Sequence, residues 1–152
     1  MTPEAKLAAM GLILPEVPKP LGTFVPFKIS GNTLYLSGEG PRHPDGSFAT
    51  GKVGRDVSLE DAYEHAKLAG LGLLAAAKAA ALELSRVEVL KVLGMVNAVR
   101  EFTDQPKVIN GCSDLFVAAL GERGRHARSA VGVGSLPLQI TVEIEAVMRI
   151  HD

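Results

Sequence analysis

Tryptophan is absent from this chain of 152 residues, and aromatic residues make up only 5% of it. Stacking surfaces for nucleic-acid bases are therefore sparse. The chain also lacks an excess of charge of either sign, because its formal net charge is −1 at pH 7. Proteins that bind nucleic acid through its phosphates usually carry a broad cationic surface. The composition thus argues against nucleic acid as a partner.

Cysteine occurs once, at Cys112, which excludes an intrachain disulfide and a cysteine metal cluster. This sparing use of cysteine favours a cytoplasmic location. The four histidines show no metal-ligand spacing, so we expect no metal site. No apolar run approaches roughly 18 residues, and the N-terminus lacks the basic start and apolar core of a signal peptide. We therefore expect no membrane span.

The chain is long enough for one domain with a substantial core, and hydrophobic residues make up 47% of it. We expect a single domain over residues 1–152, in which 1–22 form an N-terminal extension. Pro15, Pro18 and Pro20 predict an extended connector within that extension. Turn residues and alternating apolar positions predict strands over 24–29, 33–36, 87–99, 128–133 and 140–150, with a loop over 37–54.

Capping and stop residues predict three helices: a short one from Thr2 to about Met10, a long one after Ser58, and one that starts after Thr103 or Asp104 and stops near Gly121. The order of elements predicts an α+β fold, with two main helices packed on one face of a mixed or mainly antiparallel sheet. The helix after Ser58 is apolar on both sides. Either a subunit neighbour covers its leucines or they stay partly exposed.

Each of the last two predicted strands carries one charged side chain suited to acting on a substrate, Arg128 and Glu143. A hairpin centred between Ser135 and Leu136 would place Arg128 opposite Glu143, with Cβ atoms roughly 5 Å apart. We predict this hairpin. From spacing alone, the pair is either a solvated salt bridge worth about 0–1 kcal/mol or a receptor for a small acid.

Three further side chains have two interpretations each. His126 is either a structural histidine that hydrogen-bonds backbone or a proton donor and acceptor at the site. Cys112 lies on an apolar helix face, which favours a small core residue over a nucleophile. Glu39 either lines the site or is solvated in the predicted loop.

Six blocks of sequence carry a resemblance to a known family: L-Y-L-S-G-E-G-P (34–41), V-L-K-V-L-G-M-V-N-A (89–98), P-K-V-I-N-G-C-S-D-L-F (106–116), G-R-H-A-R-S-A-V-G-V (124–133), S-L-P (135–137) and V-E-I-E-A (142–146). Together they resemble the RidA/YjgF family of reactive-imine deaminases, also called endoribonuclease L-PSP. The block over 124–133 is similar to the chorismate-mutase-like branch of this family.

The resemblance implies a chorismate-mutase-like subunit that assembles as a homotrimer with active sites in clefts between subunits. It implies that Arg128 grips the carboxylate of a small substrate and that Glu143 helps to position or activate water. By the same resemblance the pocket wall is formed by Phe24, Ser37, Gly38, Asn110 and Ala130, with Glu39 and His126 as possible additions.

The implied activity is hydrolysis of small 2-imino or enamine acids to 2-keto acids and ammonia, as in a 2-iminobutanoate/2-iminopropanoate-type deaminase, without a metal or organic cofactor. Phe24 stands where the family often has tyrosine, and Ala130 stands where it has a cysteine. Glu39 stands where it usually has glutamine or a similar residue. These departures keep open a non-catalytic carboxylate-binding protein, and the family's other label keeps open RNA cleavage.

Overall fold

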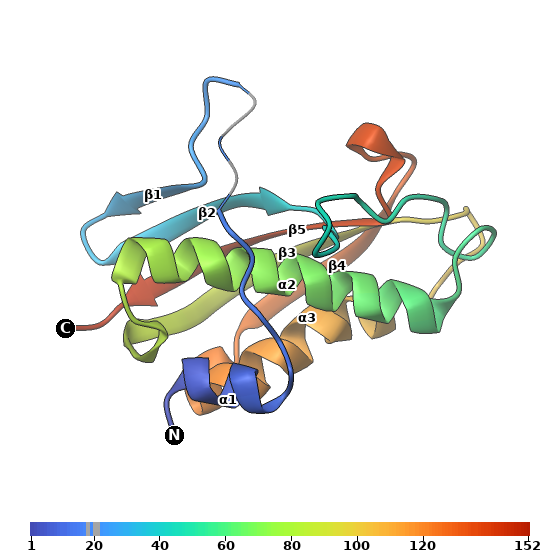
Figure 1. Ribbon diagram of the computed structural model, residues 1–152. Helices are drawn as coiled ribbons and strands as arrows, with labels where there is room; N and C mark the ends of the chain where they lie inside the picture. Colours follow the sequence, from blue (N-terminus) through green and yellow to red (C-terminus); the bar gives the residue numbers. More distant parts are fainter. Residues whose placement is uncertain (18, 20–21) are drawn as a thin grey trace.

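The computed structural model describes residues 1–17, 19 and 22–152 of the chain. A five-stranded sheet forms one layer, and two long helices cover one of its faces, with a short N-terminal helix packed against one of them (Figure 1). This is the predicted α+β arrangement. Pro15 lies in an irregular segment beside the long helices, whereas Pro18 and Pro20 of the predicted connector lie outside the described residues.

The strands are β1 (Phe27–Ser30), β2 (Thr33–Glu39), β3 (Val87–Asn97), β4 (Ala127–Val133) and β5 (Val142–Ile150). The helices are α1 (Pro3–Ala9), α2 (Leu59–Ala81) and α3 (Gln105–Leu120), with 3-10 turns at Leu84–Arg86, Gly121–Gly124 and Pro137–Gln139. The first two strands differ from the prediction at one boundary each: β1 begins at Phe27 rather than Phe24, and β2 continues beyond Leu36 to Glu39. Ser37 and Gly38 therefore lie in a strand, not in a loop.

The predicted helix boundaries are confirmed where a cap marks them. The hydroxyls of Thr2 and Ser58 each accept a hydrogen bond of 3.1 Å from the backbone N–H three residues further on. Helix α3 begins after Asp104 rather than after Thr103, and it ends at Gly121, whose φ of 64° is left-handed. Glycine adopts that conformation at no steric cost, which is why it stops the helix there.

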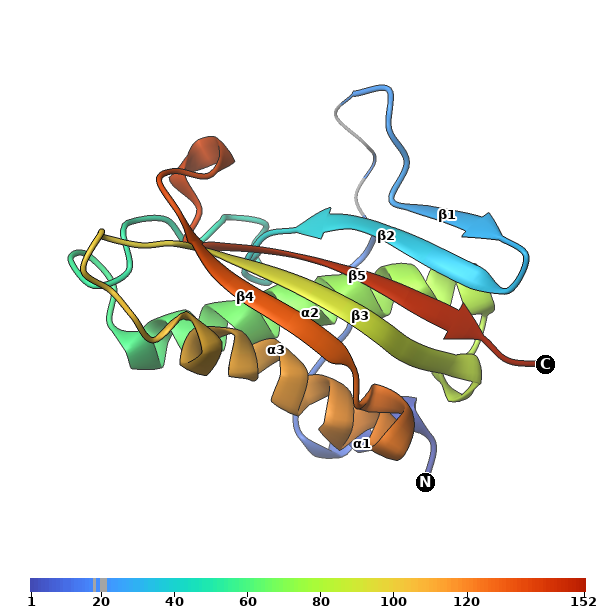
Figure 2. The same cartoon turned by 180° about the vertical axis from the view of Figure 1, so that it is seen from behind.

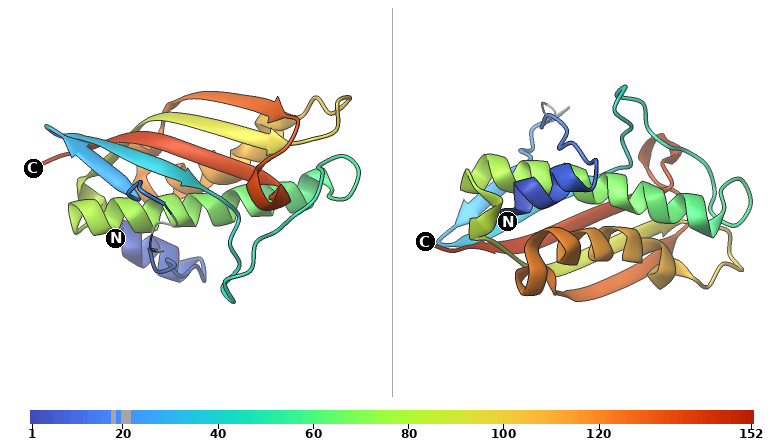
Figure 3. Two further views of the ribbon diagram at one scale, coloured as in Figure 1. Left: turned by 90° about the horizontal axis from the view of Figure 1, so that it is seen from above. Right: turned by 60° about the horizontal axis from the view of Figure 1, so that its bottom comes forward.

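The second apolar side of α2 is largely covered by this chain itself, and the alternative of partly exposed leucines holds for Leu68, which is half-buried. Leu71 and Leu74 are buried, and α3 lies alongside α2 (Figure 3). Gly111 of α3 approaches α2 so closely that a Cβ there would stand 1.9 Å from the carbonyl oxygen of Tyr63. The lack of a side chain at Gly111 therefore sets how closely the two helices pack.

The order of strands in the sheet is β1-β2-β5-β3-β4, so β3 separates the last two strands of the chain. The predicted hairpin is therefore wrong. Strand β3 is antiparallel to β5 but parallel to β4, and α3 makes the crossover that a parallel pair requires. The segment between β4 and β5 is too long for a tight turn, because it runs over residues 134–141 and contains the 3-10 turn at Pro137–Gln139. Within it Leu136 is buried, and Leu138 and Gln139 both have left-handed φ angles.

The opposite face of the sheet has no helix of the described part of the chain over it (Figure 2). Its side chains include apolar ones: Tyr35 is 50% exposed and Val131 is 42% exposed. Leu93 and Met95 between them are half-buried. None of the helices that the structure describes is long and apolar enough to cross a bilayer.

The contact between α2 and α3 gives the first prediction. Gly111→Ala should lower the free energy of unfolding by roughly 1–3 kcal/mol, because overpacking outweighs the gain in helix propensity of about 1 kcal/mol. Urea unfolding at fixed protein concentration measures the change. Gly134→Ala is the matched control, since nothing lies within 4 Å of a Cβ built there. An unchanged midpoint for Gly111→Ala would show that the helices can separate freely.

Candidate functional site

Arg128 lies near the start of β4, at the edge of the sheet, and its side chain turns toward α3. Nη1 donates to Asn110 Oδ1 at 2.8 Å and to Ser113 Oγ at 3.1 Å, which uses both of its hydrogens. Among the residues that the structure describes, Nε and Nη2 have no hydrogen-bond partner and no carboxylate lies within salt-bridge distance. The Nε–Nη2 edge is a fork that matches the two oxygens of a carboxylate.

The local sequence explains why these groups meet. Asn110 and Ser113 are three residues apart on α3, so they share one face of the helix. His126 directly precedes β4 and stands two residues before Arg128, so the two side chains project to the same side. Arg128 pairs with Val92, whose side chain is buried under the helices, and this fixes the face as the helix-covered one.

His126 extends this cluster. Its Nδ1 lies 2.6 Å from the carbonyl oxygen of Gly124, and its Nε2 lies 2.9 Å from Ser113 Oγ. A carbonyl only accepts hydrogen bonds, so Nδ1 carries a proton and the neutral ring accepts at Nε2 from the Ser113 hydroxyl. Burial lowers the pKa of His126; the Gly124 hydrogen bond opposes this, and the Arg128 charge lowers the pKa further.

The interpretation of His126 as a histidine that hydrogen-bonds backbone is confirmed, and the ring also reaches Ser113 of the Arg128 cluster. A role in proton transfer stays a prediction. Sequence reasoning had not singled out Ser113. The available signal was its spacing: Ser113 lies one helical turn from Asn110, on the face that a strand bearing His126 and Arg128 would meet.

Glu143 belongs to a second group of residues, around β2 and β5. A Cβ on Gly38 would stand 3.1 Å from the carboxyl carbon of Glu143, so this glycine lets the carboxyl lie against the backbone. Ser37 Oγ donates to the carbonyl oxygen of Val25 at 2.5 Å, which anchors the segment containing Phe24 to β2. Phe24 itself is exposed.

Arg128 and Glu143 do not share a face of the sheet within one chain, which corrects the prediction that they lie opposite one another. Glu143 pairs with Met95, whereas Arg128 pairs with Val92. Val92 is buried under the helices and Met95 lies on the uncovered face. Two strand spacings and three residues along the strands separate the pair, about 14 Å on ideal sheet geometry. Asn110 and Ala130 lie with Arg128, while Ser37 and Gly38 lie with Glu143.

Glu39 lies between β2 and α2, with its carboxyl oxygen 3.1 Å from a Cβ position on Gly72. Burial raises the pKa of Glu39, the nearby Arg42 guanidinium lowers it, and Glu143 raises it. The side chain is therefore half-buried against a helix rather than solvated in a loop.

Cys112 is fully buried, which confirms the prediction of a small core residue. Burial raises the pKa of its thiol, and the Arg128 charge only partly opposes this, so the thiolate is strongly disfavoured. Within residues 1–17, 19 and 22–152, no three histidine, cysteine, aspartate or glutamate side chains gather as metal ligands.

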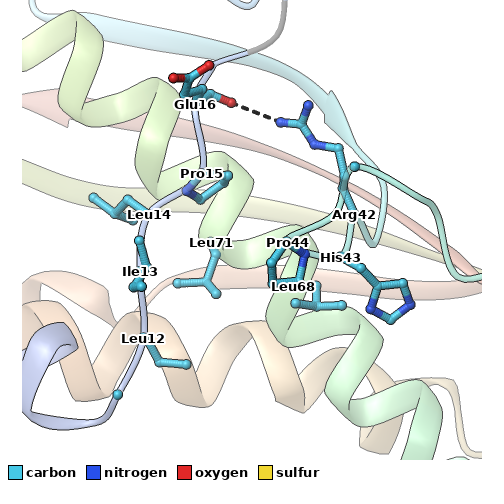
Figure 4. Close-up of a pocket in the computed structure, with 12 residues that line it drawn as sticks. Leu12, Ile13, Leu14, Pro15, Glu16, Arg42, His43, Pro44, Leu68 and Leu71 are labelled. Atoms are coloured by element: carbon cyan, nitrogen blue, oxygen red, sulfur yellow. Dashed lines mark hydrogen bonds between the residues drawn. The ribbon is translucent and has the colours of Figure 1, made fainter.

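Two cavities flank these groups. One, of about 590 Å³, is lined by the far end of β4 and the start of α3, including Gly132 and Gln105. The other, of about 480 Å³, lies between residues 11–16, α2 and the loop carrying Arg42 (Figure 4). In Figure 4 the Arg42 guanidinium donates to the backbone carbonyl of Glu16 at 2.9 Å. Neither cavity is lined by Arg128 or Glu143.

The family described as YjgF/chorismate mutase-like, putative endoribonuclease, matches residues 4–146. The chain belongs to this family. Among solved structures, Atu1372 of Agrobacterium tumefaciens is 45% identical with a TM-score of 0.91, covering 98% of this chain and 94% of that one. A protein of Shewanella oneidensis described as a putative endoribonuclease is 34% identical with a TM-score of 0.94, covering 99% and 100%.

Two further relatives of this YjgF-family chain have names of their own. Protein TCP17 of Trypanosoma cruzi is 35% identical over 150 residues, which cover 97% of this chain and 94% of that protein. A 2-iminobutanoate/2-iminopropanoate deaminase of Dermatophagoides farinae is 29% identical over 138 residues, which cover 90% and 93%.

The environment of Glu143 gives the second prediction. Burial raises the pKa of Glu143 above its ordinary value of 4.5, and the neighbouring Glu145 raises it further. A raised pKa in the folded state favours folding at pH values below 4.5, and this contribution is lost as pH rises through the folded-state pKa. Glu143→Gln stays neutral, so at pH 7 its unfolding free energy should exceed that of the wild type.

Urea unfolding at neutral and acidic pH measures this difference, which should shrink as pH falls below 4.5. Glu101→Gln, at an exposed loop position, is the control and should change little at either pH. A Glu143→Gln variant that is less stable than wild type by the same amount at both pH values would contradict the assignment.

Proposed function

We propose that this protein hydrolyses small reactive 2-imino acids, and the enamines in equilibrium with them, to 2-keto acids and ammonia. The observation that carries the proposal is the half-buried Arg128 guanidinium, whose carboxylate-binding edge has no partner among the described residues. A partly desolvated cation held by neutral acceptors gains strongly from a bound anion. The imine deaminase among its relatives supports the same chemistry.

We propose further that the working unit is a homotrimer, in which each cleft combines the Arg128 group of one subunit with the Glu143 group of the next. The separation of these groups supports this division, because within one chain the carboxylate receptor and the water-orienting Glu143 lie on opposite faces of the sheet. Strand β4 is an edge strand, and apolar side chains are exposed on the uncovered face. Such edges and patches are usually covered in the assembled protein.

The roles follow from this arrangement. The Nε–Nη2 edge of Arg128 binds the substrate carboxylate and fixes the adjacent C=N carbon in the cleft. The partner subunit's Glu143 accepts a hydrogen bond from a water molecule and orients it toward that carbon. Addition of water gives a carbinolamine, and breaking of its C–N bond releases ammonia and the 2-keto acid. Because the imine is labile in water, orientation and proton transfer need to supply only about 10²-fold.

Arg128→Gln tests the receptor. A pyridoxal-phosphate dehydratase generates 2-aminoacrylate, and the release of 2-keto acid is followed with and without the protein. Wild type should accelerate release, whereas Arg128→Gln should match the rate without protein and should no longer bind 2-ketobutyrate. Arg125→Gln is the matched control, because Arg125 is exposed and paired with Glu122 at 3.2 Å. Wild-type protein that binds 2-ketobutyrate without accelerating release would make it a carboxylate-binding protein instead.

Mixed oligomers test the division of the cleft between subunits. Arg128→Gln and Glu143→Gln should each be inactive alone, yet co-refolding them in equal amounts should restore about a quarter of the wild-type activity by random assembly. The restored clefts are those that combine an intact Arg128 with an intact Glu143 from different chains. The control is a double variant with both Arg128→Gln and Glu143→Gln, co-refolded with an equal amount of the Arg128→Gln variant. This mixture contains no intact Arg128 and should stay inactive. No restoration in the mixture would contradict a shared cleft.

A further inference from the structure

Ser113 occupies a position between a cation and a base. Its Oγ accepts a hydrogen bond from Arg128 Nη1 at 3.1 Å and lies 2.9 Å from His126 Nε2. Since His126 Nδ1 donates to the Gly124 carbonyl, the Ser113 hydrogen points to Nε2. The result is a continuous chain from guanidinium to hydroxyl to imidazole to backbone carbonyl, with one defined proton direction.

We propose that Ser113 and His126 form a proton relay for the substrate held by Arg128, with Ser113 as the catalytic group that touches the reacting atoms and His126 as the base behind it. This inference rests on the proposed function and adds two residues to it. The geometry supports it because Ser113 Oγ and a ligand on the Nε–Nη2 edge share the same guanidinium. A base hydrogen-bonded to a hydroxyl, and itself oriented by a third group, is the usual arrangement for activating that hydroxyl.

The relay operates on a protonated imine in two steps. Water adds to the C=N carbon as its proton passes to Ser113 Oγ while the Ser113 proton passes to His126 Nε2, and the C=N electron pair goes to nitrogen. The products of this step are the neutral carbinolamine and protonated His126. The relay then returns the proton to the amino nitrogen, the C–N bond breaks with its electron pair on nitrogen, and the carbonyl forms. The carbonyl proton leaves with ammonia as ammonium, and His126 is neutral again.

The surroundings of His126 suit a base that works in its neutral form. The ring packs edge-to-face with Phe116 of α3, with centroids 5.8 Å apart. The charged group that acts on it is Arg128, which opposes protonation, while the Gly124 carbonyl favours it. On the preceding turn, Arg125 and Glu122 pair with each other at 3.2 Å. The positive charge of Arg128 disfavours protonated His126, so the ring readily gives its proton back to the relay.

Kinetics of Ser113→Ala and His126→Asn test the relay. Each should lower kcat on the order of 10²-fold, leave binding of 2-ketobutyrate within about twofold of wild type, and remove the acidic limb of the kcat profile below pH 6.5. Ser113→Thr keeps the hydroxyl and should recover most of kcat. The control is Ser129→Ala, because Ser129 lies next to Arg128 on β4 but on the opposite face of the sheet. If Ser113→Ala keeps the wild-type kcat and the acidic limb of the profile, the relay is wrong. The proposed deaminase activity would still stand in that case.

Nitrogen NMR of His126 gives a readout that does not depend on turnover. The neutral ring should carry its proton on Nδ1, and adding 2-ketobutyrate should raise its pKa, because the bound anion offsets the Arg128 charge. This change should vanish in Arg128→Gln. If the wild type is not a deaminase but shows the linked change, the proposed function fails and the coupled site stands. A proton on Nε2, or a pKa that ignores the ligand, would overturn the relay.

Discussion

The proposed chemistry depends on an arginine whose guanidinium is held by neutral acceptors instead of by a carboxylate. Asn110 and Ser113 fix one nitrogen of the Arg128 guanidinium without neutralising its charge. The Nε–Nη2 edge of the guanidinium has no hydrogen-bond partner among the described residues, and the side chain is half-buried. Hydrogen bonds to an anion are stronger there than in water. A carboxylate at position 110 would complete the pair and abolish the receptor. An amide rather than an acid at that position therefore leaves the Arg128 charge without a carboxylate partner among the described residues, as the proposed carboxylate binding requires.

The fold creates this arrangement through one crossover. From β3 the chain continues through α3 into β4, which lies parallel to β3. This crossover packs the face of α3 that carries Asn110 against the side chain of Arg128 on β4. Glycine permits the close approach, because a Cβ on Gly94 of β3 would stand 2.6 Å from Ile109. The same topology inserts β3 between β4 and β5 and sends Glu143 to the other face. One chain therefore holds Arg128 and Glu143 apart, and in the proposed homotrimer a second copy brings them together.

Signals that act over a few residues predicted the fold well: the caps at Thr2 and Ser58, the stop at Gly121 and the alternation in β5 all correspond to observed features. The hairpin prediction failed because a local pattern cannot reveal a strand inserted from elsewhere in the sequence. The alternation in β5 places Glu143 off the core face, as observed. In β4 it misleads, because Val131 is exposed on the uncovered face while Arg128 turns toward α3. Nothing in the sequence pointed directly to Ser113, because its hydrogen bonds and its proposed role depend on the segment that α3 packs against.

A crystal structure of the protein with bound 2-ketobutyrate would locate the acid in the assembled molecule. We expect its carboxylate on the Nε–Nη2 edge of Arg128, beside Ser113, in a cleft that also contains the partner subunit's Glu143. A ligand bound instead in the cavity beside Arg42, or an Arg128 guanidinium already paired with a protein carboxylate in the assembled molecule, would contradict this expectation.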